Sequence, residues 1–150
     1  VFIGPAHNFR STEINAVLGL CQLNRLDDNN EKRIENYKYF VDNLDSQKYH
    51  TDFEMEGQCN YAFTIVLKKP NFNLRDRIEY QLTKNRIEYR RGMSGGGNQL
   101  RQPYFRNKNV DLSEFKVVDH IHNFSWYVGN YPTLEREKIN KLLEILNEVE

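Results

Sequence analysis

The sequence has few of the residues that mark disulfide-bonded or metal-binding proteins. Two cysteines, Cys21 and Cys59, in 150 residues are too few for a disulfide framework. There is no CxxC or HExxH motif, and His120 and His122 have no partners at the spacing of a zinc site. We therefore expect no metal site and assign these two histidines to local packing or hydrogen bonding.

Long apolar runs and nucleotide-binding motifs are also missing. No stretch approaches the ~18 consecutive apolar residues that a membrane span requires. The glycine-rich run Gly92–Gly97 has neither the P-loop spacing nor the GxGxxG spacing. We expect neither a membrane nor a dinucleotide in a Rossmann-type site as a partner.

The charge is balanced overall but unevenly placed. The chain has 21 Lys and Arg against 21 Asp and Glu, and this neutrality argues against a nucleic-acid-binding protein. Residues 84–108, here called the basic segment, hold seven Lys and Arg against Glu88 alone. The segment also contains Gly95–Gly97. Two interpretations stay open: a solvated loop with ordinary surface arginines, or an anion site where guanidinium and backbone N–H groups converge.

Hydrophobic periodicity predicts the secondary structure. Apolar residues at helical spacing indicate helices, the first capped by Ser11 or Thr12, a later one by Asn73 and the last by Thr133. The expected helices cover about residues 12–26, 31–44, 73–84, 113–122 and 133–149. The polar residues 27–30 are either a break between the first two helices or a polar turn within one long helix. β-Branched and aromatic runs predict strands at residues 61–67, 87–90 and 124–128. This order favours a small layered domain of the α/β or α+β type.

The first helix carries a marked apolar stripe. Ile14, Val17, Leu18 and Cys21 repeat at helical spacing and would lie on one face. Such a face usually packs in a core or a subunit contact, so Cys21 is expected to be a buried thiol. No catalytic constellation stands out, and the best candidates from the residues alone are anion binders. These are Asn8, Arg10, Arg90, Arg91, Asn98 and Arg101.

Three blocks, in order along the chain, resemble one enzyme family. They are NFRSTEINAVLGLCQL at residues 8–23, GNQLRQPYF at residues 97–105 and FSWYVGNYPTL at residues 124–134. The sequence resembles the DegT/StrS-type pyridoxal-phosphate (PLP) enzymes, which include nucleotide-sugar aminotransferases and 3-dehydratases. The last two blocks are most similar to the branch that contains the dehydratases.

The resemblance implies the C-terminal part of the aspartate-aminotransferase-like (type I PLP transferase) fold, with a small, mainly antiparallel sheet flanked by helices. Residues 1–25 would be the remnant of the large PLP domain and the start of the linking helix, and residues 26–150 the small domain. The family's Schiff-base lysine motif does not occur in these residues. We therefore expect the chain alone to be inert, with no PLP bound covalently to it.

The resemblance also implies residue roles. Asn8 matches an asparagine that reaches the PLP phosphate of the partner subunit, and Arg10 matches a position near the nucleotide-sugar phosphates. Arg90, Asn98 and Arg101 match the region that closes over the sugar. For Arg101 an anchor within its own loop is an equal alternative. The block before Asn98 departs from the family pattern, because Gly95 and Gly96 stand where bulkier residues are more common.

The implied function is amino transfer from glutamate to a keto sugar linked to a nucleotide, in the biosynthesis of a surface polysaccharide such as lipopolysaccharide or of a related sugar. The alternatives are a fragment of a 3-dehydratase or a non-catalytic nucleotide- or sugar-binding or assembly module. The resemblance further implies a cytoplasmic protein. If the cover of the apolar stripe is absent, a homodimer or higher oligomer is expected.

Overall fold

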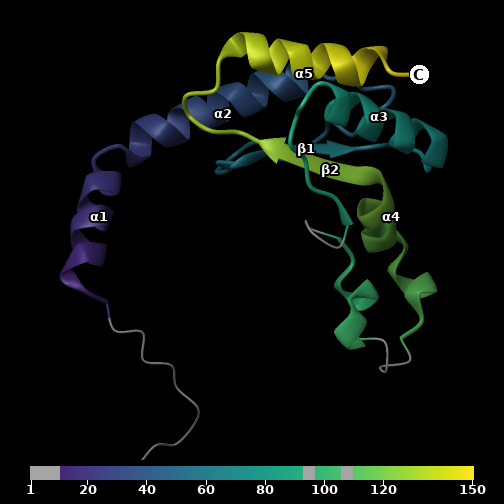
Figure 1. Cartoon of the computed structure of the whole chain (residues 1–150), viewed down its shortest axis with the longest axis horizontal. Helices are drawn as coiled ribbons and strands as arrows, with labels where there is room; N and C mark the ends of the chain where they lie inside the picture. Colours follow the sequence, from purple (N-terminus) through teal and green to yellow (C-terminus); the bar gives the residue numbers. More distant parts are fainter. Residues whose placement is uncertain (1–10, 93–96, 106–109) are drawn as a thin grey trace, which may run out of the picture.

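The computed structural model describes residues 11–92, 97–105 and 110–150 (Figure 1). The helices are α1 (Glu13–Leu23), α2 (Leu26–Asn43), α3 (Phe72–Lys84), α4 (Lys116–Phe124) and α5 (Arg136–Glu148). The strands are β1 (Ala62–Val66) and β2 (Ser125–Gly129), and three short 3-10 helices are η2 (Gln99–Arg101), η3 (Pro103–Phe105) and η4 (Leu112–Phe115). None of the helices in these ranges is both long and apolar enough to cross a membrane.

The two strands form an antiparallel sheet. Ile65 lies opposite Trp126, and Phe63 lies opposite Val128. Single bridges continue the sheet on both sides, from Tyr49 to Leu67 and from Arg90 to Tyr127. The small antiparallel sheet with flanking helices confirms the fold class that the sequence predicts.

Helices α2, α3 and α5 pack with the sheet to make one core (Figure 1). Side chains alternate along each strand, so Phe63, Ile65 and Trp126 are buried on the helix side. The apolar stripe of α5 meets the core through Ile139 and Leu146, which are fully buried. The periodicity of the last helix therefore correctly predicted its inner face.

Four helix starts and one strand differ from the sequence expectation. Helix α2 begins at Leu26 instead of residue 31, and α4 begins at Lys116, after η4, instead of at residue 113. The side chain of Asn71, not Asn73, caps α3 by accepting the Leu74 N–H at 3.0 Å. Helix α5 begins after Glu135 rather than Thr133, because the Glu135 carbonyl accepts the first backbone bond, from Lys138, at 3.0 Å. The expected strand at residues 87–90 forms only the bridge at Arg90. The N–H of Ile87 instead bonds back to Leu82 at the end of α3, at 2.9 Å.

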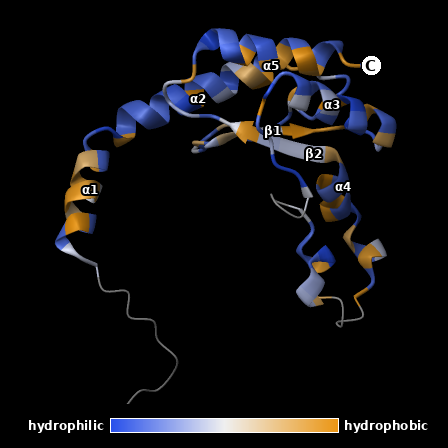
Figure 2. Ribbon diagram, in the orientation of Figure 1, coloured by the Kyte–Doolittle hydropathy of each residue, from blue (hydrophilic) through white to orange (hydrophobic). Residues whose placement is uncertain are grey.

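Helix α1 stands apart from the core, and its apolar residues are exposed (Figure 2). Ile14 is 72% exposed and Leu18 is 60% exposed. Cys21 is also exposed, so the expectation of a buried thiol is wrong. The periodicity identified an apolar face, but no described residue covers that face. A break at Asn24–Arg25 separates α1 from α2, whereas residues 27–30, where the sequence also allowed a break, lie within α2.

Candidate functional site

Elements η2, η3, η4 and α4 form an arm that projects from the end of the sheet (Figure 1). Asn98, in the turn before η2, is only 1% exposed and is held at three points. Its N–H donates to Nδ1 of His122 at 3.0 Å, and its Oδ1 accepts the Leu100 N–H at 3.0 Å. Its Nδ2 is 3.4 Å from Oδ1 of Asp119. The backbone and side chain of Asn98 therefore join the turn before η2 to α4 within the arm.

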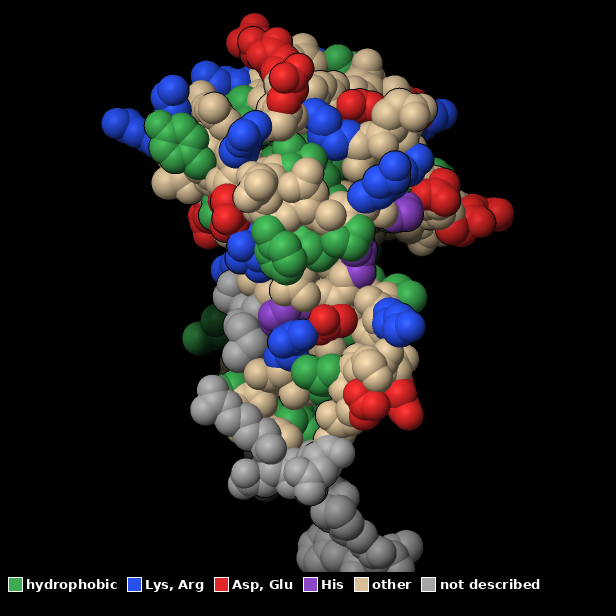
Figure 3. All heavy atoms as spheres, turned by 90° about the vertical axis from the view of Figure 1, so that its right-hand side faces the viewer, with side chains coloured by type: hydrophobic (Ala, Val, Ile, Leu, Met, Phe, Trp, Pro, Cys, Tyr) green, Lys and Arg blue, Asp and Glu red, His purple; other side chains and the backbone are tan. Residues whose placement is uncertain are grey.

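Arg101 and Asp119 form a two-point ion pair between the two halves of the arm. Nη2 of Arg101 donates to Oδ2 of Asp119 at 2.8 Å, and Nε donates to Oδ1. The guanidinium holds the pKa of the Asp119 carboxyl below its usual range, and the carboxylate raises the pKa of Arg101. Acidic, basic and histidine side chains lie side by side at the narrow part of the molecule (Figure 3). A bidentate pair of this kind fixes the orientation of both planar groups.

The glycines on either side of the undescribed residues 93–96 permit a close approach to α4. Gly92 has φ of +58°, which favours glycine, and its carbonyl accepts the Gly97 N–H at 3.0 Å. A Cβ at Gly97 would lie 2.4 Å from both the Gly92 carbonyl oxygen and Nδ1 of His122. Gly97 is therefore required for the backbone to reach His122.

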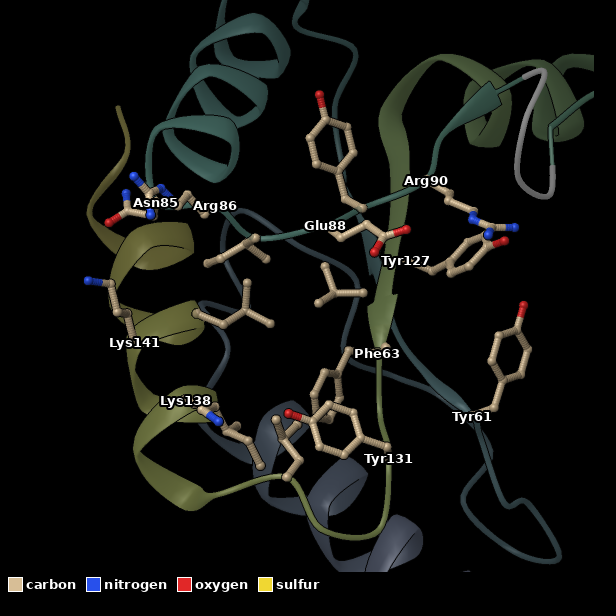
Figure 4. Close-up of a pocket in the computed structure, with 17 residues that line it drawn as sticks. Tyr61, Phe63, Asn85, Arg86, Glu88, Arg90, Tyr127, Tyr131, Lys138 and Lys141 are labelled. Atoms are coloured by element: carbon tan, nitrogen blue, oxygen red, sulfur yellow. The ribbon is translucent and has the colours of Figure 1, made fainter.

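Arg90 lies elsewhere, at the outer edge of β2. Its N–H and carbonyl exchange two bonds of 3.1 Å with Tyr127. The side chains of Arg90, Tyr127 and Tyr61 lie close together beside the strand (Figure 4). The two tyrosine rings meet edge to face at 5.9 Å, and a hydrogen bond with Tyr127 raises the pKa of Tyr61.

The structure thus brings Asn98 and Arg101 together in the arm and leaves Arg90 at a pocket that neither of them lines. Asn8, Arg10 and the glycines Gly95 and Gly96 lie outside the described residues. The PLP-phosphate role of Asn8 therefore still rests on the resemblance alone.

Two acidic residues of the network were missed from the sequence. Asp119 holds Arg101, and Glu79 on α3 accepts the indole N–H of Trp126 at 2.9 Å and pairs with Arg91. For Asp119 a signal was present, because Asp119 and His122 are three residues apart and so share a face of α4. His122 accepts a hydrogen bond from the Asn98 N–H, which agrees with the role in local hydrogen bonding that the sequence predicts. In residues 11–92, 97–105 and 110–150, no three His, Cys, Asp or Glu residues gather as metal ligands.

The bond to His122 predicts a pH dependence of stability. Burial, followed by the charge of Arg101, lowers the pKa of His122 below 6.5, and Nδ1 can accept the Asn98 N–H only when it carries no proton. Below pH 6.5 the unfolded chain binds this proton more readily than the folded chain does, so the free energy of unfolding falls as the pH falls. We expect a slope of at most about 1.4 kcal/mol per pH unit from this group.

Urea unfolding between pH 7.5 and 5 measures this dependence. The variant His122→Gln should lose the His122 part of the slope, whereas His50→Gln at a more exposed site should keep it. The backbone amide resonance of Asn98 should shift over the same pH range. Equal slopes in the native chain and His122→Gln, with a static Asn98 resonance, would contradict the prediction.

Comparison with known proteins identifies a family for this chain. Residues 3–147 match the DegT/DnrJ/EryC1/StrS aminotransferase family. The lipopolysaccharide biosynthesis protein RfbH of Salmonella typhimurium is 29% identical over 147 residues, which are 95% of this chain and 33% of RfbH. The chain therefore spans about a third of the length of this curated relative.

Solved structures show the same fold. A GDP-4-keto-6-deoxymannose-3-dehydratase with a trapped PLP-glutamate geminal diamine has a TM-score of 0.76 at 24% identity, over 97% of this chain and 38% of that one. A mutant of that dehydratase with bound GDP-perosamine has a TM-score of 0.75, also at 24% identity and the same coverage. An aminotransferase from Psychrobacter cryohalolentis has a TM-score of 0.78 at 21% identity, over 98% and 40%. With a family match over nearly its whole length, the chain belongs to the DegT/DnrJ/EryC1/StrS aminotransferase family.

Proposed function

We propose that this chain is the C-terminal small domain of a PLP-dependent enzyme that transfers an amino group from glutamate to a nucleotide-linked keto sugar. The family match over residues 3–147 carries the proposal. It is supported by the similarity to RfbH and to structures whose bound groups are PLP-glutamate and GDP-perosamine. The cytoplasmic location implied by the resemblance is part of the proposal.

In this proposal the arginines meet the anionic part of the ligand. Arg90 is exposed at the edge of β2, and its planar guanidinium suits a phosphate. Asn98 and Arg101 act mainly by holding the arm in shape, because their polar groups are engaged with Leu100 and Asp119. Arg10 keeps its proposed place near the sugar phosphates, and Asn8 its proposed contact with the PLP phosphate of the partner subunit.

When bound, PLP supplies the electron-accepting ring on which the transfer depends. The small domain would contribute binding and closure over the sugar. Because the Schiff-base lysine motif is not among these 150 residues, we propose that this polypeptide alone is inert. A PLP-dependent absorbance change that one lysine substitution abolishes would overturn this point.

A second candidate activity within the family is 3-dehydration of a GDP-linked keto sugar. It is supported by the dehydratase neighbours, which are 24% identical to this chain, against 21% for the aminotransferase from Psychrobacter cryohalolentis. In either enzyme the exposed apolar face of α1 would be covered by further protein, so the isolated chain should form a dimer or a higher oligomer.

Binding of nucleotide sugars tests the proposed function. We expect GDP-mannose at millimolar concentration to shift the Arg90 and Tyr127 resonances of the full chain, and Arg90→Ala to weaken this binding at least about fivefold. Lys32→Ala on α2 is the control for loss of one exposed positive charge. UDP-glucose provides the comparison for the nucleotide. Absence of any shift, or sedimentation of the chain as a monomer, would count against the corresponding part of the proposal.

A further inference from the structure

We infer that residues 97–105 are held to α4 by an acid-sensitive latch, and that protonation of His122 releases them while the core stays folded. These residues contain η2 and η3 and form one half of the arm (Figure 1). Global unfolding also breaks the bond to His122, but the opening inferred for this latch is local and leaves the sheet and α5 in place. The inference does not depend on the proposed function.

Polar bonds rather than apolar packing hold residues 97–105 in place. None of their side chains belongs to the buried apolar core of the described chain. Asn98 is the one buried residue among them, and the ring of Tyr104 is 65% exposed. Segments with few buried apolar contacts open at a lower free-energy cost than the core does. This half of the arm can therefore detach without disruption of the core.

Two attachments join residues 97–105 to α4. In the first, the His122 bond, the backbone N–H of Asn98 donates to Nδ1 of His122 at 3.0 Å. In the second, the Arg101 ion pair, Nη2 of Arg101 donates to Oδ2 of Asp119 at 2.8 Å. His122 and Asp119 are three residues apart, so both attachments end on one face of α4.

The His122 bond exists only while Nδ1 carries no proton. A protonated imidazole has a donor on each nitrogen and no acceptor, and the backbone N–H of Asn98 is also a donor. The chain lies close against the ring at this point, because a Cβ at Gly97 would be 2.4 Å from Nδ1. A proton on Nδ1 therefore sets two donors against each other at the distance of the present bond. Protonation replaces an attractive contact by a repulsive one.

The charges described around His122 oppose its protonation while the latch is closed. Arg101 on η2 and Arg91, which follows the bridge to β2, disfavour a positive ring, whereas Asp119 on α4 favours one. Burial is the largest cause of the lowered pKa of His122, and Arg101 is the next. Release of residues 97–105 exposes the ring, removes Arg101 and frees Asp119 to pair with the imidazolium. The open form therefore binds the proton more tightly, which is the condition for a proton to shift the equilibrium.

The Arg101 ion pair keeps its charges over the range in which His122 titrates. Arg101 holds the pKa of Asp119 below its usual value of 3.8, so the carboxylate stays ionised between pH 7.5 and 5. Arg91 is paired with Glu79 on α3, and an arginine stays protonated throughout this range. Because the pKa of His122 is lowered in the closed form, closure is favoured at neutral pH and becomes weaker as the pH falls below 6.5.

Native-state hydrogen exchange of the full chain, followed by NMR, tests the latch. The measured quantity is protection, the amide exchange rate relative to an unfolded peptide at the same pH. Between pH 7.5 and 5 we expect the protection of the Asn98 and Leu100 amides to fall at least about threefold. Their protection should not change between zero and about 1 M urea, because local opening exposes little surface.

The Leu67 amide is the reference for the core, where it bonds to the Phe124 carbonyl at 3.0 Å. It should be more strongly protected than the Asn98 and Leu100 amides at each pH, and its protection should fall with urea. If the Asn98 and Leu100 amides share the protection and the urea dependence of Leu67, residues 97–105 open only with the whole fold and the inference is overturned.

Two variants separate the proton from the ion pair. His122→Gln keeps an acceptor that does not titrate, so the protection of Asn98 should stay within about 1.5-fold over the same pH range. Arg101→Gln removes the ion pair and a charge that disfavours the proton. In this variant the protection of Leu100 should be lower at pH 7.5 and should fall less in acid.

His50→Gln, at a more exposed histidine, is the matched control and should behave like the native chain. A fall in His122→Gln as large as that in the native chain would refute the assignment of the switch to His122. None of these measurements uses a nucleotide sugar. The latch and the proposed function can therefore fail independently of each other.

Discussion

Replacing Trp126 by alanine is expected to lower the free energy of unfolding by about 3–5 kcal/mol, enough to unfold much of a marginally stable domain. Trp126 is 1% exposed and lies opposite Ile65 in the sheet. Its removal would leave a large cavity in the core and would also take away the indole N–H that Glu79 accepts at 2.9 Å. Glu79 would then depend on Arg91 alone among the donors seen in the described residues.

Urea unfolding measured by far-UV circular dichroism tests this prediction, because Trp126 is the single tryptophan and its fluorescence is lost in the variant. Trp126→Phe separates the two causes. It keeps most of the ring volume but not the indole donor, and should cost about 1–2 kcal/mol. Tyr80→Ala, at a residue that is 63% exposed, should change stability by about 0.5 kcal/mol or less. A loss below about 1 kcal/mol in Trp126→Ala would contradict the assignment of Trp126 to the core.

Asn130→Ala is the second large effect that we expect, a loss of about 2–4 kcal/mol. Asn130 is 1% exposed, and its Nδ2 donates to the backbone carbonyls of Arg33 and Asn60, both at 2.9 Å. Its own N–H donates to the Tyr61 carbonyl at 2.7 Å. One side chain therefore joins α2, the loop before β1 and the end of β2. Alanine would leave two partly buried carbonyls without this donor.

A matched pair of variants shows whether the donor matters. Asn130→Asp is nearly isosteric but sets a carboxylate oxygen against two carbonyl oxygens, so near neutral pH it should destabilise more than Asn130→Ala. In acid the protonated Asp can donate again, and the difference should shrink. Asn140→Ala removes an exposed amide that accepts from the Tyr39 hydroxyl at 2.7 Å and should cost less than about 1 kcal/mol. Equal stability of the Asp and Ala variants at pH 7 would refute the role of the two donor bonds.

The strands and the last helix could be predicted because their signals are local. Residues 61–67 and 124–128 are rich in β-branched and aromatic side chains, and Ile139 and Leu146 fall on one face of a 3.6-residue repeat. The start of α3 was placed two residues late, because both Asn71 and Asn73 have the side chain of a cap. Only the extended backbone of Asn71 brings its Oδ1 to the Leu74 N–H.

The candidate site was less predictable. The sequence pointed to Asn98 and Arg101 and left open two roles for Arg101, a sugar contact or an anchor within its own loop. Its partner Asp119 is 18 residues away, and His122 is 24 residues from Asn98. Whether such residues meet depends on how the arm folds back, which no local pattern encodes. The sequence also predicted a strand at residues 87–90, of which only the Arg90 bridge forms, because the Ile87 N–H bonds back to the end of α3.

By itself the sequence determined the positions of the two strands, the inward face of α5, the basic segment and, through three ordered motifs, the family, whose resemblance implied the antiparallel sheet. These properties depend on side-chain period, composition and residue order, all of which are written along the chain. Only the tertiary structure decided that the apolar face of α1 is exposed, that Arg101 is paired with Asp119, and that Asn98 bonds to His122. Each of these depends on which distant surfaces meet, and that is set by packing and hydrogen-bond geometry in three dimensions.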